Sequence, residues 1–99
     1  MAINEVESAP KLRKMLFANR HLFRELESEG ITRYELRDAV RAIDKDGEFP
    51  TGENHATLAL LIVAQLAGVA KNPQAFNWDK IFELIEKLMP LIELWMTGC

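Results

Sequence analysis

The fold is decided in the second half of the chain, where two apolar stretches follow one another: residues 56–70 read ATLALLIVAQLAGVA and residues 78–96 read WDKIFELIEKLMPLIELWM. The first stretch contains only two polar residues, Thr57 and Gln65, so it predicts a helix that is apolar on all sides. A helix of that kind belongs in the interior of a protein. We therefore expect residues 55–70 to form the central helix of the fold.

The second stretch predicts an amphipathic helix over residues 78–96, because apolar residues recur there at three- and four-residue spacing. Pro90 lies inside this helix and predicts a kink, since proline removes a backbone donor and clashes with the preceding turn. The apolar face is wider than one neighbouring helix can easily cover. The flank that we expect to remain open comprises Leu84, Leu88, Leu91, Leu94 and Trp95.

Such an open flank predicts a partner, because soluble monomers rarely expose a large continuous apolar patch. A symmetric homodimer is the commonest way to cover a patch of this kind, and another helical protein would serve equally well. The alternative is that the helices of the first half of the chain wrap both flanks and leave nothing exposed. We expect self-association through the C-terminal helix.

The first half of the chain predicts two further helices. Pro10 is well placed at the start of a helix over residues 10–29. Thr32 and Glu35 form the pattern of a capping box, which predicts the start of a helix over residues 32–46. The face of the first helix that points away from its apolar residues carries Arg13, Phe17, Arg20 and Arg24.

Together these elements predict a compact all-α domain of four helices spanning residues 1–99, with a loop at residues 47–54 and a flexible N-terminus at residues 1–9. A hydrophobic fraction of 48% and a charged fraction of 27% are those of a folded globular chain. The single cysteine, Cys99, excludes an intrachain disulfide, and the acidic start Met1–Ser8 lacks the features of a signal peptide. We therefore expect a cytoplasmic protein.

Residues 29–39, EGITRYELRDA, resemble the turn and second helix of a helix-turn-helix DNA-binding motif. In that resemblance Gly30 is the turn glycine, and the helix that follows would present donors to phosphates and base edges. One departure is the preceding helix, which at about twenty residues is long for the motif. The residues that would face DNA are Arg33, Tyr34, Arg37 and Arg41. The alternative is a solvated face on which these arginines pair with Glu29, Glu35 and Asp38.

An acidic turn resembles the opening of an EF-hand calcium loop, with Asp44, Asp46 and Glu48 at its first three ligand positions. Phe49 falls where the motif needs glycine and His55 falls where it needs a closing glutamate. We therefore expect no metal here and interpret these residues as the acidic end of a helix followed by a turn.

Neither histidine predicts a catalytic or metal site, because His21 and His55 have no partner residues at ligand spacing. The helix over residues 55–70 is too short to span a bilayer, and the one over 78–96 carries too many charges. We expect no catalytic residues and no cofactor. The leading hypothesis is a non-enzymatic protein-protein interaction or assembly module, and the alternative is a DNA-binding regulator of the helix-turn-helix type.

Overall fold

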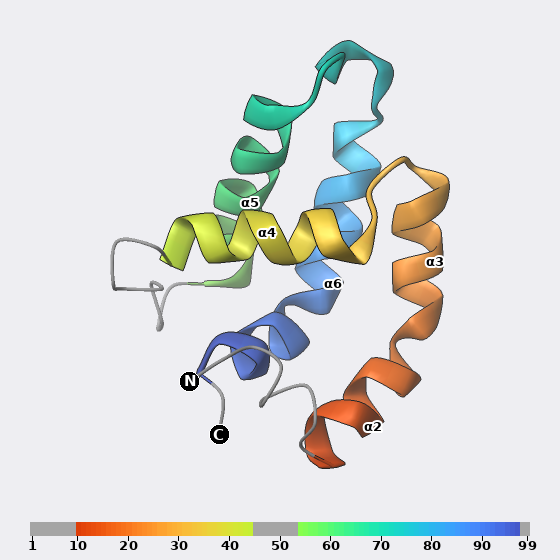
Figure 1. The fold of residues 1–99 in the computed structure, drawn as a ribbon, viewed down its shortest axis with the longest axis vertical. Coiled ribbons are helices and arrows are strands. Elements are labelled where there is room, and N and C mark those ends of the chain that lie inside the picture. The colour runs from red at the N-terminus through yellow and green to blue at the C-terminus, as the bar shows by residue number, and fades with distance from the viewer. Residues whose placement is uncertain (1–9, 45–53, 98–99) are drawn as a thin grey trace.

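The computed structural model describes residues 10–44 and 54–97 of the 99-residue chain. The predictions for residues 1–9, for most of the 47–54 loop and for Cys99 fall outside these residues. Within them the chain forms helices and connecting turns and no strand, so the all-α class is confirmed (Figure 1). The elements are α2 (Pro10–Ala18), α3 (Arg20–Ser28), α4 (Arg33–Asp44), α5 (His55–Val69), the short 3₁₀ helix η1 (Pro73–Ala75) and α6 (Trp78–Thr97).

The predicted first helix is divided in two at Asn19, which is a correction to the sequence prediction. Asn19 has φ −105° and ψ 12°, outside the helical region. Its backbone N–H and its side-chain Nδ2 both donate to the Met15 carbonyl oxygen, at 3.0 and 2.8 Å. Its own carbonyl oxygen then accepts from the Leu22 N–H at 3.0 Å. The residue therefore ends α2 and starts α3 in a new direction, as Figure 1 shows.

The turn between α3 and α4 joins two capping motifs. Gly30 has φ +97°, its N–H donates to the Glu27 carbonyl, and the N–H of Ile31 donates to the Leu26 carbonyl at 2.9 Å. This is the Schellman arrangement, which closes the end of α3. The predicted capping box follows directly and is confirmed by two hydrogen bonds of 3.1 Å, one from the Thr32 N–H to Glu35 Oε1 and one from the Glu35 N–H to Thr32 Oγ1.

Side chains also fix the starts of α5 and α6. Asn54 Oδ1 accepts from the Thr57 N–H at 2.8 Å, and Asn77 Oδ1 accepts from the Lys80 N–H at 3.2 Å. α6 continues through the exposed Pro90 and changes direction in its C-terminal part (Figure 1). Because Pro90 faces solvent, the backbone carbonyl that it leaves without an intrahelical donor can be hydrated.

The central helix is α6, not α5 as the sequence predicted. α6 lies between α5 and α3, α2 packs against it, and α4 runs across the bundle against α5 (Figure 1). Among the described residues, eight of α6 are buried and four of α5. The buried residues of α6 are Ile81, Leu84, Ile85, Leu88, Met89, Leu91, Ile92 and Trp95.

Candidate functional site

The predicted partner surface on α6 lies inside the single chain. Leu84, Leu88, Leu91 and Trp95 are all buried, and Leu94 is half-buried. The Trp95 ring packs edge-on against Phe23 of α3, with 6.5 Å between the ring centroids. The expected open flank is therefore covered by the chain itself. A second chain could reach these side chains only if α6 came away from the helices around it.

An apolar surface is open instead on α5. Leu60 is 60% exposed and Leu61 is 44% exposed. We call the exposed stripe at three- and four-residue spacing the open face of α5; it comprises Thr57, Leu60, Leu61, Ala64 and Gly68. A Cβ atom added at Gly68 would meet no atom within 4 Å, so nothing in the described structure covers that end of the stripe. The chain carries no charged residue between His55 and Lys71, and the face is accordingly uncharged.

The candidate nucleic-acid residues of α4 gather around one exposed ring. Tyr34 is 59% exposed. The Arg33 and Arg37 guanidinium carbons lie 5.8 and 5.4 Å from its ring centroid, and both arginines are half-buried. Arg41 is exposed one turn beyond Arg37, and no carboxylate of the described residues lies within ion-pair distance of it. The acidic residues Glu35 and Asp38 lie along the other edge of α4, because their positions are rotated away from the arginines.

One difference from the helix-turn-helix motif, the length of the helix before the turn, is absent from the structure. Because the helix is interrupted at Asn19, the helix before the turn has nine residues, not about twenty. Gly30 has the positive φ expected of the turn glycine, and its missing side chain also makes room for a neighbour. A Cβ atom there would lie 2.6 Å from the Phe76 ring, so the turn is packed directly against the segment between α5 and α6.

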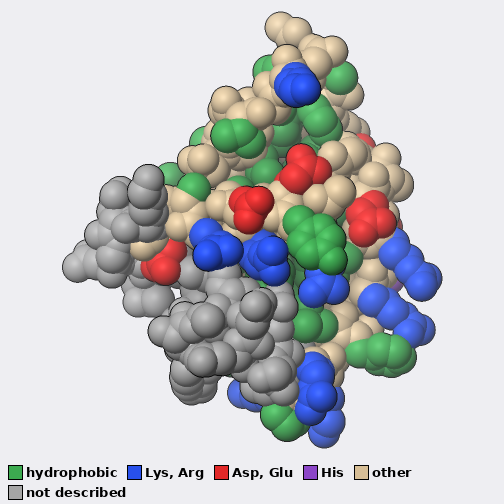
Figure 2. Space-filling model, viewed as in Figure 1, with side chains coloured by type: hydrophobic (Ala, Val, Ile, Leu, Met, Phe, Trp, Pro, Cys, Tyr) green, Lys and Arg blue, Asp and Glu red, His purple; other side chains and the backbone are tan. Residues whose placement is uncertain are grey.

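A second exposed aromatic side chain lies on α2. Phe17 is 67% exposed, and the Arg20 guanidinium carbon lies 4.2 Å from the centre of its ring. Arg13 and Lys14 line a shallow surface hollow together with Phe17. Figure 2 shows the wider pattern: Lys and Arg side chains run along one edge of α4 and continue over α3 and α2, with exposed hydrophobic side chains among them.

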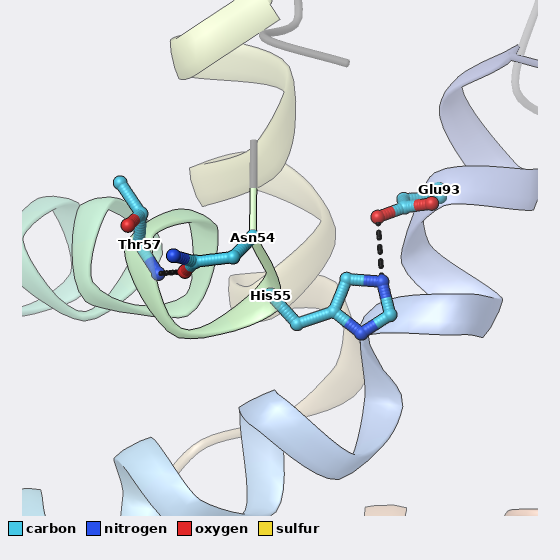
Figure 3. Close-up of polar contacts among 4 residues, drawn as sticks. All are labelled: Asn54, His55, Thr57 and Glu93. Atoms are coloured by element: carbon cyan, nitrogen blue, oxygen red, sulfur yellow. Dashed lines mark hydrogen bonds and ion pairs between the residues drawn. The ribbon is translucent and has the colours of Figure 1, made fainter. Parts of the chain in front are cut away.

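The two histidines differ in their surroundings. His21 is exposed on α3. His55 Nε2 lies 2.8 Å from Glu93 Oε1, which joins the first turn of α5 to the last turns of α6 (Figure 3). Figure 3 also shows the cap formed by Asn54 on the same turn. Both members of the His55–Glu93 pair are partly exposed, and the arrangement is that of a surface contact between two helices.

Of the three acidic residues in the EF-hand-like turn, Asp44 ends α4, while Asp46 and Glu48 lie outside the described residues. Among residues 10–44 and 54–97, no three histidine, cysteine or acidic side chains gather closely enough to hold a metal ion. No helix in the same residues combines the length and the apolar character that a membrane crossing needs.

Comparison with known protein families, with curated proteins and with solved structures finds no match. The candidate surfaces therefore stand on their own geometry. Sequence reasoning missed the exposure of Leu60 and Leu61, because it placed α5 in the interior. The available signal was the number of small residues in α5, which bury less area per position than the leucines, isoleucines and tryptophan of α6.

Proposed function

We propose that this chain is a non-enzymatic assembly module that self-associates through the open face of α5. The observation that carries the proposal is the exposure of Leu60 and Leu61 on a helix face without charge. Single exposed leucines are ordinary on protein surfaces. Two adjacent ones on a continuous stripe at helical spacing are typical of a helix that packs against a further helix.

A second copy of the chain suits this face better than a charged partner. Because the stripe has no charge, two copies can bring it together without like-charge repulsion, although the whole chain has a formal charge of −3. Within the stripe, the large side chains of Leu60 and Leu61 are followed by the small residues Ala64 and Gly68.

This gradient in size favours an antiparallel pair related by a two-fold axis. If the axis passes near Ala64, Leu60 of one copy lies opposite Gly68 of the other, because the two residues are equally distant from Ala64 along the helix. The large side chain of one copy then fills the space above the glycine of its partner. A parallel pair would instead place leucine against leucine and leave both glycines uncovered.

The expected dimer is weak. Each copy contributes two partly exposed leucines, and full burial of such a side chain stabilises by about 1.5–3 kcal/mol. Four leucines therefore supply roughly 4–8 kcal/mol after allowance for the area that is already buried, against an association cost of about 4 kcal/mol or more. The difference is at most about 4 kcal/mol, so we expect a concentration-dependent equilibrium with a dissociation constant of about a millimolar or above.

Light scattering without a column, at concentrations up to about the millimolar dissociation constant, tests the proposal, with reductant present so that Cys99 cannot crosslink two chains. We expect a mass that rises towards that of a dimer with concentration, and we expect Leu60→Glu to abolish the rise because it buries a charge in the pair. Phe17→Glu is the matched control, since it introduces the same charge at a similarly exposed apolar position on α2. A native chain that stays monomeric at every concentration would overturn the proposal.

A substitution at Gly68 separates the dimer from the stability of the single chain. Gly68→Leu places a side chain in open space, so it should raise the stability of the isolated chain through its better helix propensity, by about 0.8 kcal/mol. The same side chain occupies the space that Leu60 of the second copy needs. We therefore expect a higher melting temperature together with loss of the dimer, and a dimer that survives both Gly68→Leu and Leu60→Glu would contradict the α5 pairing.

A further inference from the structure

The described Lys and Arg residues are concentrated in the first half of the structure. Residues 10–44 contain eight of them against six Asp and Glu, whereas residues 54–97 contain three against four. Figure 2 shows the Lys and Arg side chains on one side of α4 continuing over α3 and α2, while acidic side chains follow the opposite edge of α4. We define the basic face by six Lys and Arg residues of α2, α3 and α4, of which Arg37 is half-buried and the others are exposed: Arg13, Lys14, Arg20, Arg24, Arg37 and Arg41.

The basic face contains two exposed aromatic rings that are each contacted by arginine. Arg20 lies over Phe17 at 4.2 Å and Arg37 lies near Tyr34 at 5.4 Å. The exposed Arg20 guanidinium rests on the Phe17 ring, and this contact restricts its freedom before an anion is bound. The rings themselves remain more than half exposed, at 67% for Phe17 and 59% for Tyr34.

We infer that the basic face binds single-stranded nucleic acid, with phosphates held by the arginines and bases stacked on Phe17 and Tyr34. Surfaces that bind single strands combine basic side chains that follow the backbone with aromatic rings on which bases stack. Both components are present on this face. The inference does not depend on self-association, because the open face of α5 shares no residue with the basic face.

A single strand fits this face better than a duplex does. In a duplex the bases stack on one another, so Phe17 and Tyr34 would have no base to contact. A helix that enters the major groove also brings both of its edges close to phosphates, and Glu35 and Asp38 on the second edge of α4 would be repelled. A single strand of nucleic acid needs to contact only the edge of α4 that carries Arg37 and Arg41.

The net charge of the chain does not prevent this binding. The described residues 10–44 and 54–97 contain eleven Lys and Arg against ten Asp and Glu, so the formal charge of −3 comes from acidic residues outside them. At an ionic strength of about 0.1 M the Debye length is about 10 Å, so acidic residues on the far side of the molecule contribute little at the basic face. The local arrangement of charge therefore decides the interaction, not the total.

Fluorescence anisotropy of labelled oligothymidylate and oligouridylate of about 20 nucleotides tests the inference with the full chain. We expect saturable binding at about 50 mM salt that weakens steadily as salt is added, because phosphate contacts release counterions. Phe17→Ala and Tyr34→Ala should each reduce affinity by about fivefold or more. Because both side chains are largely exposed, these variants should fold normally, which circular dichroism verifies.

A matched pair of charge reversals locates the binding surface. Arg20→Glu with Arg24→Glu should abolish binding, whereas Lys80→Glu with Lys87→Glu makes the same change in net charge on α6 and should leave affinity within about twofold. Equal losses from the two pairs, or no binding of either strand at low salt, would overturn the inference. Tighter binding of a duplex of the same length, unaffected by Phe17→Ala, would overturn it in favour of the helix-turn-helix hypothesis.

Discussion

α5 and α6 are the two most apolar helices of the chain, yet they occupy opposite kinds of environment. α6 lies between α3 and α5 with eight of its described residues buried, while α5 packs one side against the bundle and exposes Leu60 and Leu61 on the other. Apolar composition alone does not distinguish them. The volume of the side chains decides which helix occupies the centre.

The difference follows from the area that each helix can bury. α5 has alanine or glycine at five positions, whereas the apolar positions of α6 carry leucine, isoleucine, phenylalanine, methionine and tryptophan. Because stabilisation grows with buried apolar area, placing α6 in the interior contributes more than placing α5 there. The charged residues of α6 do not oppose this arrangement, since Asp79, Glu83 and Lys87 follow one narrow exposed stripe with Pro90.

The largest expected effect is the difference in stability between two leucine-to-alanine variants, one in α6 and one in α5. Leu88→Ala removes a fully buried side chain from α6 and should lower the free energy of unfolding by about 2–5 kcal/mol. Leu60→Ala removes an exposed one from α5 and should change it by about 0.5 kcal/mol or less. Urea denaturation at a concentration where the chain is monomeric measures both. Equal losses would break the distinction between the helices.

The segment between α5 and α6 packs against the α3–α4 turn at Gly30, and the stability of the fold should depend on this contact. Gly30→Ala forces a left-handed backbone on alanine and pushes its Cβ into the Phe76 ring, so we expect a loss of about 1–3 kcal/mol. Gly68→Ala is the control with the opposite sign: it lies in open helix and should stabilise by about 0.5–1 kcal/mol. Thermal melts compare the two variants. A neutral Gly30→Ala would mean that Phe76 is not held against this turn.

The smallest expected effect is at the contact between the start of α5 and the end of α6. His55→Ala removes a partly exposed pair with Glu93 and should lower stability by at most about 1 kcal/mol. The neighbouring Asn54→Ala removes the cap to the Thr57 N–H and should have the larger effect, within about 0.5–2 kcal/mol. Denaturation of both variants in the same buffer gives the order, and a reversed order would show that the helices are held together through His55.

The sequence predicted the helices wherever a local signal defined them. The capping box at Thr32 and the positions of α5 and α6 agree with the structure to within one or two residues. The break at Asn19 was missed because asparagine is compatible with a helix interior, and the signal is a side-chain hydrogen bond to the Met15 carbonyl that only the structure shows. The basic and aromatic residues of α4 were named in advance. The exposure of Leu60 could not be predicted, because it depends on which helix occupies the interior of the bundle.

The turn between α3 and α4 also has a consequence for the order of folding. The Schellman end of α3 and the capping box of α4 follow one another within residues 26–36, and Leu26, Ile31 and Leu36 are all buried. Contacts so close in sequence have little loop-closure entropy to overcome and form early. The α3–α4 corner can therefore form early. α5 and α6 also follow one another in sequence and pack against each other, so they can form a second local unit, and the fold is completed when the two units meet.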